Sequence, residues 1–217
     1  ISACLVGSEM CIRDRVNLYF EAEQDWRDEE AQALSGIHSR ALDIGCGAGR
    51  HLLALQRRAF AVGLDNSKLV LRVCRERGGR LLVLACARRL PFKAGNFDAV
   101  LLMNNGLGIS GDMKRTTEML TDVRRVLSKS GQLIGHTSDP NEPGTAVDEG
   151  YRLRNLSAHR AAGLVKLRVR YKCFVGPWFD LVLLAPDEVE AALRKTGLRL
   201  RRMIPWESSR IYVAGPA

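Results

Sequence analysis

The clearest structural signal is Ala41-Leu42-Asp43-Ile44-Gly45-Cys46-Gly47-Ala48-Gly49-Arg50-His51, where an apolar run passes directly into a turn with three glycines. Glycine adopts left-handed backbone conformations that other residues avoid, so glycine at every second position indicates a tight loop. Residues 52–58, which follow, have the apolar spacing of a helix. The sequence therefore predicts a strand, a tight loop and a helix in succession, a junction that commonly binds ligands.

Apolar runs that alternate with helical segments extend from this loop in both directions. Strands are predicted at residues 40–44, 60–64, 81–85, 97–103, 132–137, 198–204 and 210–214. Helices are predicted at residues 16–34, 68–77, 116–127 and 186–195. Strands that are apolar on both faces and alternate with helices are typical of a parallel sheet covered on both sides. We therefore predict a doubly wound α/β fold whose seven-stranded, mostly parallel sheet ends in an antiparallel C-terminal strand pair.

Length and hydropathy limit the chain to one core. With 217 residues, 46% of them hydrophobic, it can bury one sizeable core but is short for two full domains. It contains neither an apolar run long enough to span a membrane nor a basic and apolar leader with a cleavage site. We therefore expect a single domain over residues 16–217, in the cytoplasm and without a membrane partner.

Charge and cysteine usage narrow the possible partners. The net charge of +9 would suit an acidic partner, but the arginines are spread over the chain, with no dense basic run among aromatic residues. On the charge distribution alone, we therefore do not expect nucleic acid as a partner. The six cysteines include no CxxC pair and no histidine at metal-ligand spacing, so we expect neither a disulfide nor a metal site.

Two segments do not fit the alternation of strands and helices. Residues 1–15 lack periodicity and partly resemble adapter-derived sequence, so we expect this segment to be non-native or disordered. Residues 150–176 are predicted to form an inserted β-hairpin, with strands at 151–156 and 164–174, that acts as a lid over the open strand ends. Basic and apolar residues alternate along its second strand. We expect the basic face to be a solvated outer face, with an anion-binding wall as the alternative.

The carboxyl ends of parallel strands form the ligand-binding edge of such a sheet. This rule brings together Asp43, Asp65, Cys86 and Asn104, each at or just beyond the end of a predicted strand. A dinucleotide is disfavoured, because the glycine spacing is GxGxG and because Asp43 would repel a pyrophosphate. A ligand with a sulfonium and an ammonium group would instead be attracted, and S-adenosylmethionine (SAM) is such a ligand.

The motif Asp43-Ile44-Gly45-Cys46-Gly47-Ala48-Gly49 resembles motif I (DxGCGxG) of the class I SAM-dependent methyltransferases. The resemblance continues through Asp65, the Leu90-Pro91-Phe92 segment and Gly131 before the fifth strand, over roughly residues 16–139. It implies an enzyme that binds SAM in a Rossmann-like fold and transfers its methyl group.

The resemblance also implies roles for individual residues. Asp43, with the loop Gly45-Cys46-Gly47, would hold the methionine moiety, and Gly49 would let the helix pack closely. Asp65 would accept hydrogen bonds from both ribose hydroxyls. The family often has an acidic residue for the adenine amine where this chain has Cys86-Ala87, which leaves adenine recognition to the backbone of Ala87 and to stacking from Leu64, Asn66 or Leu90. Asn104 would lie near the methyl group.

The methyl acceptor is the least determined part of this prediction. The sequence favours an O or N nucleophile of a small molecule, methylated by in-line displacement. If that nucleophile must lose a proton, His136 near the end of the fifth strand is the candidate base. An RNA-directed methyltransferase and a SAM-binding protein without turnover remain the alternatives.

Overall fold

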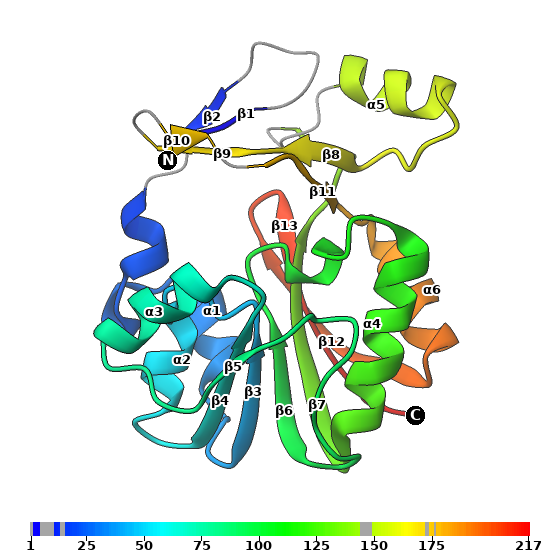
Figure 1. The fold of residues 1–217 in the computed structure, drawn as a ribbon. Helices are drawn as coiled ribbons and strands as arrows, with labels where there is room; N and C mark the ends of the chain where they lie inside the picture. Colours follow the sequence, from blue (N-terminus) through cyan, green and yellow to red (C-terminus); the bar gives the residue numbers. More distant parts are fainter. Residues whose placement is uncertain (1, 5–10, 14–15, 144–148, 172–173, 176) are drawn as a thin grey trace.

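A computed structural model describes residues 2–4, 11–13, 16–143, 149–171, 174–175 and 177–217. Its centre is a sheet with the strand order β12-β13-β7-β6-β3-β4-β5 (Figure 1). These strands are β3 (Arg40–Ile44), β4 (Phe60–Asp65), β5 (Leu82–Leu84), β6 (Phe97–Leu102), β7 (Leu127–Ser138), β12 (Leu198–Trp206) and β13 (Ser209–Pro216).

The sheet has the predicted topology. Strands β5, β4, β3, β6 and β7 run parallel to one another, whereas β13 runs antiparallel to both β7 and β12. The order reverses beside β3, since the chain moves outward to β4 and β5 and then returns to β6 on the other side. The doubly wound α/β fold and the antiparallel C-terminal pair are therefore confirmed, and β3 leads into the glycine loop at the point of reversal.

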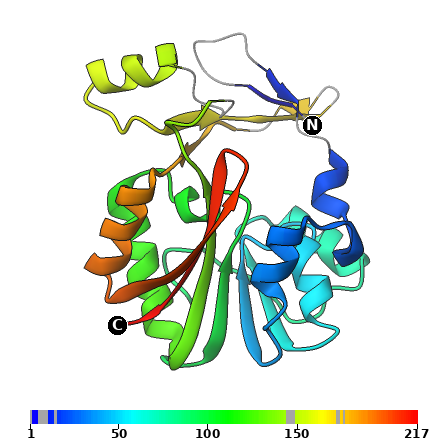
Figure 2. The ribbon, with the colours of Figure 1, turned by 180° about the vertical axis from the view of Figure 1, so that it is seen from behind.

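Helices cover both faces of the sheet (Figures 1 and 2). On one face, α1 (Asp28–Leu34), α2 (Arg50–Leu55) and α3 (Lys68–Glu76) bury apolar side chains against the sheet. On the other, α4 (Met113–Val126) and α6 (Pro186–Lys195) do the same. Because the central strands are covered on both faces, most of their side chains are apolar and buried. The charged exceptions, Arg40, Asp43, Asp65 and Asp98, lie at or near strand ends.

The N-terminal helix predicted at residues 16–34 is interrupted. The chain forms two short 3-10 helices, η1 (Val16–Phe20) and η2 (Glu23–Asp25), before α1. Trp26 and Arg27 have extended backbones between η2 and α1. The break turns Trp26 inward, where its ring packs 5.3 Å from that of His51 and is 7% exposed. Burial of this large ring outweighs continuous helix formation here.

The inserted segment begins with a helix, so the strand predicted at residues 151–156 is wrong. Helix α5 (Glu149–Ser157) places Tyr151 and Asn155 one turn apart on its buried face. The Asn155 amide donates hydrogen bonds to the carbonyls of Ala162 (3.2 Å) and Leu164 (2.7 Å). This buried amide satisfies the backbone of the following turn, a contact that hydrophobic spacing does not reveal.

In the structure the insert extends from α5 to β11, residues 149–182, and its antiparallel strands differ from those predicted. β8 (Leu164–Leu167) pairs with β11 (Phe179–Val182), while β9 (Val169–Tyr171) pairs with β10 (Phe174–Val175) and with the N-terminal strand β1 (Ser2–Cys4). β1 also pairs with β2 (Cys11–Arg13). These strands and α5 lie across the carboxyl edge of the parallel strands (Figure 1). The remainder of the segment 1–15 lies outside the described residues, and its foreign origin stays a prediction.

No helix in the described part of the chain is long and apolar enough to cross a membrane.

Candidate functional site

The glycine loop after β3 is held by hydrogen bonds to the neighbouring strand. The amides of Gly45 and Cys46 both donate to the carbonyl of Leu64, at 2.7 and 3.1 Å. Gly45, Gly47 and Gly49 all have φ between 55° and 91°, in the left-handed region that favours glycine. A Cβ atom added to Gly45 or Gly47 would meet nothing closer than 3.5 Å. The loop therefore exposes backbone to which a ligand can approach closely.

Asp65, at the end of β4, connects this loop to the next helix. Its Oδ2 accepts a hydrogen bond from the amide of Gly47 (3.1 Å), and its Oδ1 accepts one from the amide of Ser67 (2.9 Å). Ser67 caps α3, because its hydroxyl accepts from the amide of Val70. The carboxylate is thus fixed in position and still has unused lone pairs on both oxygens.

A cavity of about 180 Å³ opens beside this carboxylate at the carboxyl edge of the sheet. Five of the predicted site residues line it: Gly45, Asp65, Asn66, Cys86 and Ala87. Six further residues complete the lining: Leu64, Ala85, Arg88, Ile109, Ser110 and Arg115. Ile109, Ser110 and Arg115 were not predicted, because only Asn104 was selected from the segment that follows the fourth strand. The position of that segment after a central strand was the available signal.

Asp43 lies beneath the glycine loop and is 2% exposed. Burial raises its pKa to about 6, opposed by the nearby His51 and reinforced by the charge of Asp65. Its Oδ2 has no hydrogen-bond partner among the described residues. A buried carboxylate oxygen without a partner is costly, so this position favours a ligand that brings positive charge close to the loop.

Cys46 and Gly49 support the loop from the core side. Cys46 is 5% exposed and packs among the apolar side chains under α2 and α3, so only its backbone faces the loop. A Cβ atom at Gly49 would lie 2.7 Å from Sγ of Cys74 in α3. Gly49 therefore allows α2 and α3 to approach each other, and neither Cys46 nor Gly49 lines the cavity.

Asn104 and Asn105 form a left-handed turn after β6, with φ values of 50° and 62°. Asn104 is exposed at the carboxyl edge, outside the cavity lining. Asn105 is fixed by β7, because its Oδ1 accepts from the amide (2.7 Å) and the hydroxyl (3.1 Å) of Ser138. The turn is thus held in a conformation that asparagine tolerates better than most residues.

His136 holds the same turn from below. Its Nδ1 accepts a hydrogen bond from the amide of Asn105 (2.9 Å), and its Nε2 lies 3.0 Å from Oγ of Ser209. Burial lowers its pKa to about 4, and its ring packs 4.7 Å from the ring of Trp206. Because both ring nitrogens are engaged, the geometry favours a positioning role for His136 over the proton-accepting role expected from sequence.

A buried ionic cluster, which the sequence analysis missed, links the N-terminal helices to α2. Oε1 of Glu30 lies 2.6 Å from Nε2 of His51 and also pairs with Arg50, whose Nη2 donates to Glu21 at 2.6 Å. Glu30 is fully buried; despite the opposing effect of burial, its contacts with His51 and Arg50 hold its pKa below the usual value. The cluster fixes the start of the helix that follows the glycine loop.

The donor set fits SAM. The ligand needs an acceptor for the ribose hydroxyls, which Asp65 supplies, and close backbone approach, which the open glycines supply. It also carries positive charge, which the partnerless Oδ2 of Asp43 favours. Apolar lining from Leu64, Ala85 and Ile109 suits the flat adenine ring.

Comparisons with known proteins agree with this geometry. Residues 41–131 match the family model described as "Methyltransferase domain". The chain is 30% identical over 142 residues to the demethylmenaquinone methyltransferase of Staphylococcus haemolyticus, covering 60% of this chain and 58% of that protein. It is 29% identical over 176 residues to the tRNA U34 carboxymethyltransferase of Psychromonas ingrahamii, covering 73% of this chain and 51% of that protein. The chain thus spans about half the length of these curated relatives.

A solved structure shares the whole fold. The SAM-dependent methyltransferase from Bacteroides fragilis, in complex with S-adenosyl-L-homocysteine, superimposes with a TM-score of 0.81 at 22% identity, over 100% of this chain and 87% of that one. Residues 41–131, which contain the glycine loop and Asp65, therefore form a methyltransferase domain, and the chain as a whole has the fold of the SAM-dependent methyltransferases.

Proposed function

We propose that this chain transfers the methyl group of SAM to an O or N nucleophile of a small-molecule acceptor by in-line displacement. The observation that carries the proposal is the cavity at the strand edge, where Asp65 and the open glycine loop meet, with the insert lying across the same edge. Positioning can lower the barrier of such a displacement by about 7 to 11 kcal/mol. The chain therefore needs chiefly to hold donor and acceptor in line.

Each part of the cofactor has residues that would hold it. Asp65 would accept the ribose hydroxyls, and the backbone of Gly45 and Gly47, above Asp43, would hold the methionine moiety. Leu64 and Ile109 would contact adenine, with the backbone at Cys86 and Ala87 in place of the missing acidic residue. When bound, SAM supplies a methyl group on a positively charged sulfur.

The test combines calorimetry with turnover. Titration of SAM should show stoichiometric binding, and incubation with a panel of small phenols, carboxylates and amines should convert SAM to S-adenosylhomocysteine. Binding without conversion on any acceptor would support the SAM-binding protein without turnover instead. No binding at all would overturn the proposal.

An RNA acceptor is the second candidate, favoured by the tRNA U34 carboxymethyltransferase among the relatives and by the net charge of +9. If RNA were the acceptor, the affinity for bulk tRNA should fall steeply with salt, because bound lysines and arginines release counterions from the phosphates. Weak tRNA binding that does not depend on salt would favour a small-molecule acceptor over RNA.

The affinity for SAM should depend on pH through Asp43. The carboxyl holds its proton up to about pH 6, but the cationic ligand favours the ionised form. Binding should therefore tighten as pH rises toward 6, by up to about tenfold per pH unit for one released proton. Calorimetry between pH 4.5 and 6.5 measures this slope, and Asp43→Asn should remove it. An identical slope in that variant would contradict the assigned role.

The same carboxyl should limit the stability of the protein without ligand. Since the folded-state pKa of Asp43 lies above its unfolded value of 3.8, the folded protein holds the proton more tightly, and stability falls as pH rises from about 4 to 6. The loss amounts to about 3 kcal/mol, at about 1.4 kcal/mol per pKa unit. Asp43→Asn should therefore raise the melting temperature at pH 7.5 while weakening SAM binding.

His136→Gln should distinguish positioning from proton transfer. As a positioning residue, His136 holds Asn105, so its loss should lower kcat severalfold without removing an ionisation from the pH profile of kcat/KM. As a base, it would give that profile a limb that disappears in the variant. Ser209→Ala is the companion variant, because it loosens the imidazole without deleting it and should have a smaller effect in the same direction.

A further inference from the structure

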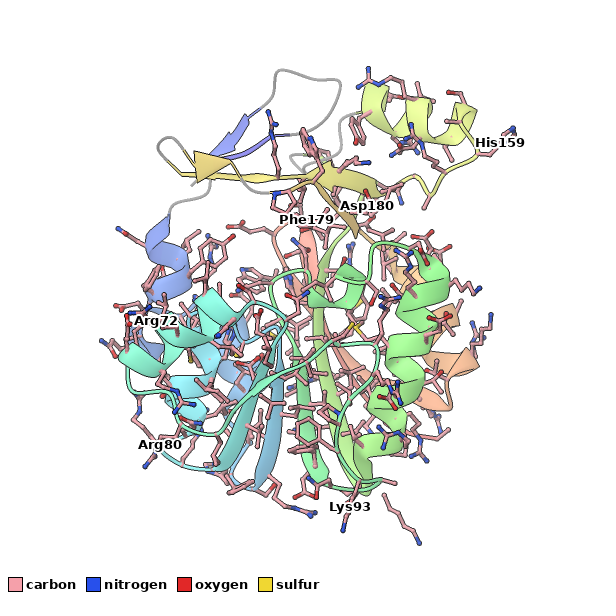
Figure 3. All side chains as sticks on the ribbon, viewed as in Figure 1. Arg72, Arg80, Lys93, His159, Phe179 and Asp180 are labelled. Atoms are coloured by element: carbon pink, nitrogen blue, oxygen red, sulfur yellow. The ribbon has the colours of Figure 1, made fainter. Side chains whose placement is uncertain are left out.

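Two strands of the insert present one face to the core of the protein. In the antiparallel pair β8–β11, Asp180 lies opposite Lys166 and Val182 lies opposite Leu164, so these four residues share a face. Val182 is fully buried in the main core. A Cβ atom at Gly111, just before α4, would lie 3.1 Å from Cβ of Asp180. This face is therefore turned toward the sheet, where Figure 3 labels Asp180 and Phe179 at the junction between insert and core.

The opposite face of the pair is apolar and packs under α5. Val165 and Leu167 form a separate buried cluster there with Tyr151 and Leu183. Lys166 is exposed, as the predicted solvated face requires. The face that it shares with Asp180, however, is turned toward the cofactor-binding edge rather than outward.

Arg168, directly after β8 and two residues from Lys166, contacts Trp178, two residues before Asp180. Its Cζ lies 4.5 Å from the centroid of the Trp178 ring, which precedes β11 and is 39% exposed. Its Nε is buried without a hydrogen-bond partner, and no ion pair to Arg168 occurs in the described part of the chain. Stacking on an aromatic ring fixes the guanidinium plane and leaves its edge for bidentate binding of an oxyanion.

This face lies beside the cofactor cavity. Asp180 approaches Gly111, and the two residues before Gly111, Ile109 and Ser110, line the cavity. Trp178 directly precedes β11 and lies two residues before Asp180, at most about 7 Å away along the chain. A molecule held by Arg168 could thus extend toward the place where the methyl group would be presented.

We propose that Arg168, stacked on Trp178 and assisted by Lys166, binds an anionic group, a carboxylate or a phosphate, on the methyl acceptor. This inference rests on the proposed function, since it assigns the substrate class of the same site. Lys166 and Arg168 carry two positive charges, and Asp180, opposite Lys166, carries one negative charge that offsets part of their electrostatic potential. The net potential therefore favours an anion.

The test observes Trp178 directly. Protein labelled with ¹⁵N-tryptophan gives indole signals, of which Trp178→Phe identifies one. Benzoate and phenyl phosphate are then titrated in the presence of S-adenosylhomocysteine, with neutral benzamide as the matched probe. We expect one of the two anions, but not benzamide, to shift the Trp178 signal, and Arg168→Gln to weaken that binding at least tenfold. The anion that binds more tightly shows whether the site prefers a carboxylate or a phosphate.

Three variants sharpen the result. Arg168→Lys keeps the charge but loses the planar fork, so it should restore only part of the affinity. Asp180→Asn should leave anion binding unchanged or tighter, because it removes the only carboxylate described on this face. Arg72→Gln alters an exposed arginine that pairs with Glu76 on α3 (Figure 3) and should change nothing.

Failure of this inference is distinguishable from failure of the proposed function. If no anion shifts the Trp178 signal, or if Arg168→Gln binds the anion as tightly as the wild type, the anion site is overturned. SAM binding measured by calorimetry would still support the proposed function. A Trp178 shift produced only by tRNA, with a steep salt dependence, overturns the small anionic acceptor in favour of nucleic acid. Loss of SAM binding by the wild type would instead overturn the proposed function.

Discussion

Replacing Asp65 with alanine should weaken SAM binding at least 100-fold, the largest effect on affinity expected from a single side chain. Two hydrogen bonds from ribose hydroxyls to a carboxylate contribute about 1.5 to 3 kcal/mol each, and every 1.4 kcal/mol is a tenfold change. The same substitution also removes the acceptor for the amides of Gly47 and Ser67. Isothermal titration calorimetry with SAM measures the loss.

The matched control for Asp65→Ala lies at the opposite end of the sheet. Asp98, near the start of β6, accepts hydrogen bonds from Arg40 at 3.1 Å and from the Ser128 hydroxyl at 2.9 Å, and these contacts lower its pKa to about 2. Asp98→Ala should therefore reduce stability, most visibly above pH 4, where the carboxylate is ionised. It should leave SAM affinity within about twofold. Equal loss of SAM affinity in both variants would mean that Asp65 acts only through folding.

The sheet and the cofactor edge could be predicted because they follow from local chemistry. Glycines at positions 45, 47 and 49 require a tight loop whatever the rest of the chain does, and an apolar run buried on both faces requires cover from helices. The strand ends then determine which residues meet. This reasoning placed Gly45, Asp65 and Cys86 around one cavity without knowledge of any contact.

The insert could not be predicted in the same way, because its conformation depends on distant partners. Residues 151–156 satisfy helix and strand patterns almost equally, and the choice is made by Asn155, whose amide bonds the backbone of the next turn. Similarly, the pairing of β8 with β11 joins segments separated by β9 and β10. Such non-local pairing has no signal in a short window of sequence.

The role of His136 illustrates the same limit at the level of chemistry. Its position near the end of β7 suggested a base, and sequence could not reveal that the amide of Asn105 occupies one ring nitrogen and Ser209 faces the other. Protonation of a buried histidine is costly, so its pKa of about 4 is a consequence of its surroundings rather than of its residue type.

Replacing Gly108 with alanine should separate the insert from the core and abolish turnover. Gly108 closes the short 3-10 helix η3 (Gly106–Gly108), and a Cβ atom there would lie 1.6 Å from the carbonyl oxygen of Val182 in β11. Backbone must therefore move by more than about 1 Å, since Cβ contacts below 3.0 Å essentially never occur. A cost of about 3 kcal/mol, typical of overpacking, should lower the melting temperature by about 6 to 12 °C. Differential scanning calorimetry and a turnover assay measure both effects.

Gly36→Ala is the control for this substitution, because a Cβ atom there meets nothing within 4 Å and its melting temperature should be unchanged or slightly higher. Since Gly108 precedes Ile109 in the cavity wall, a second variant separates docking of the insert from damage to the cofactor site. A Cβ atom at Gly163, just before β8, would lie 2.0 Å from the carbonyl oxygen of Leu183, the residue that follows Val182. Gly163→Ala should therefore keep SAM binding yet lose turnover. Full turnover in both variants would show that methyl transfer does not require the insert to be packed against the core.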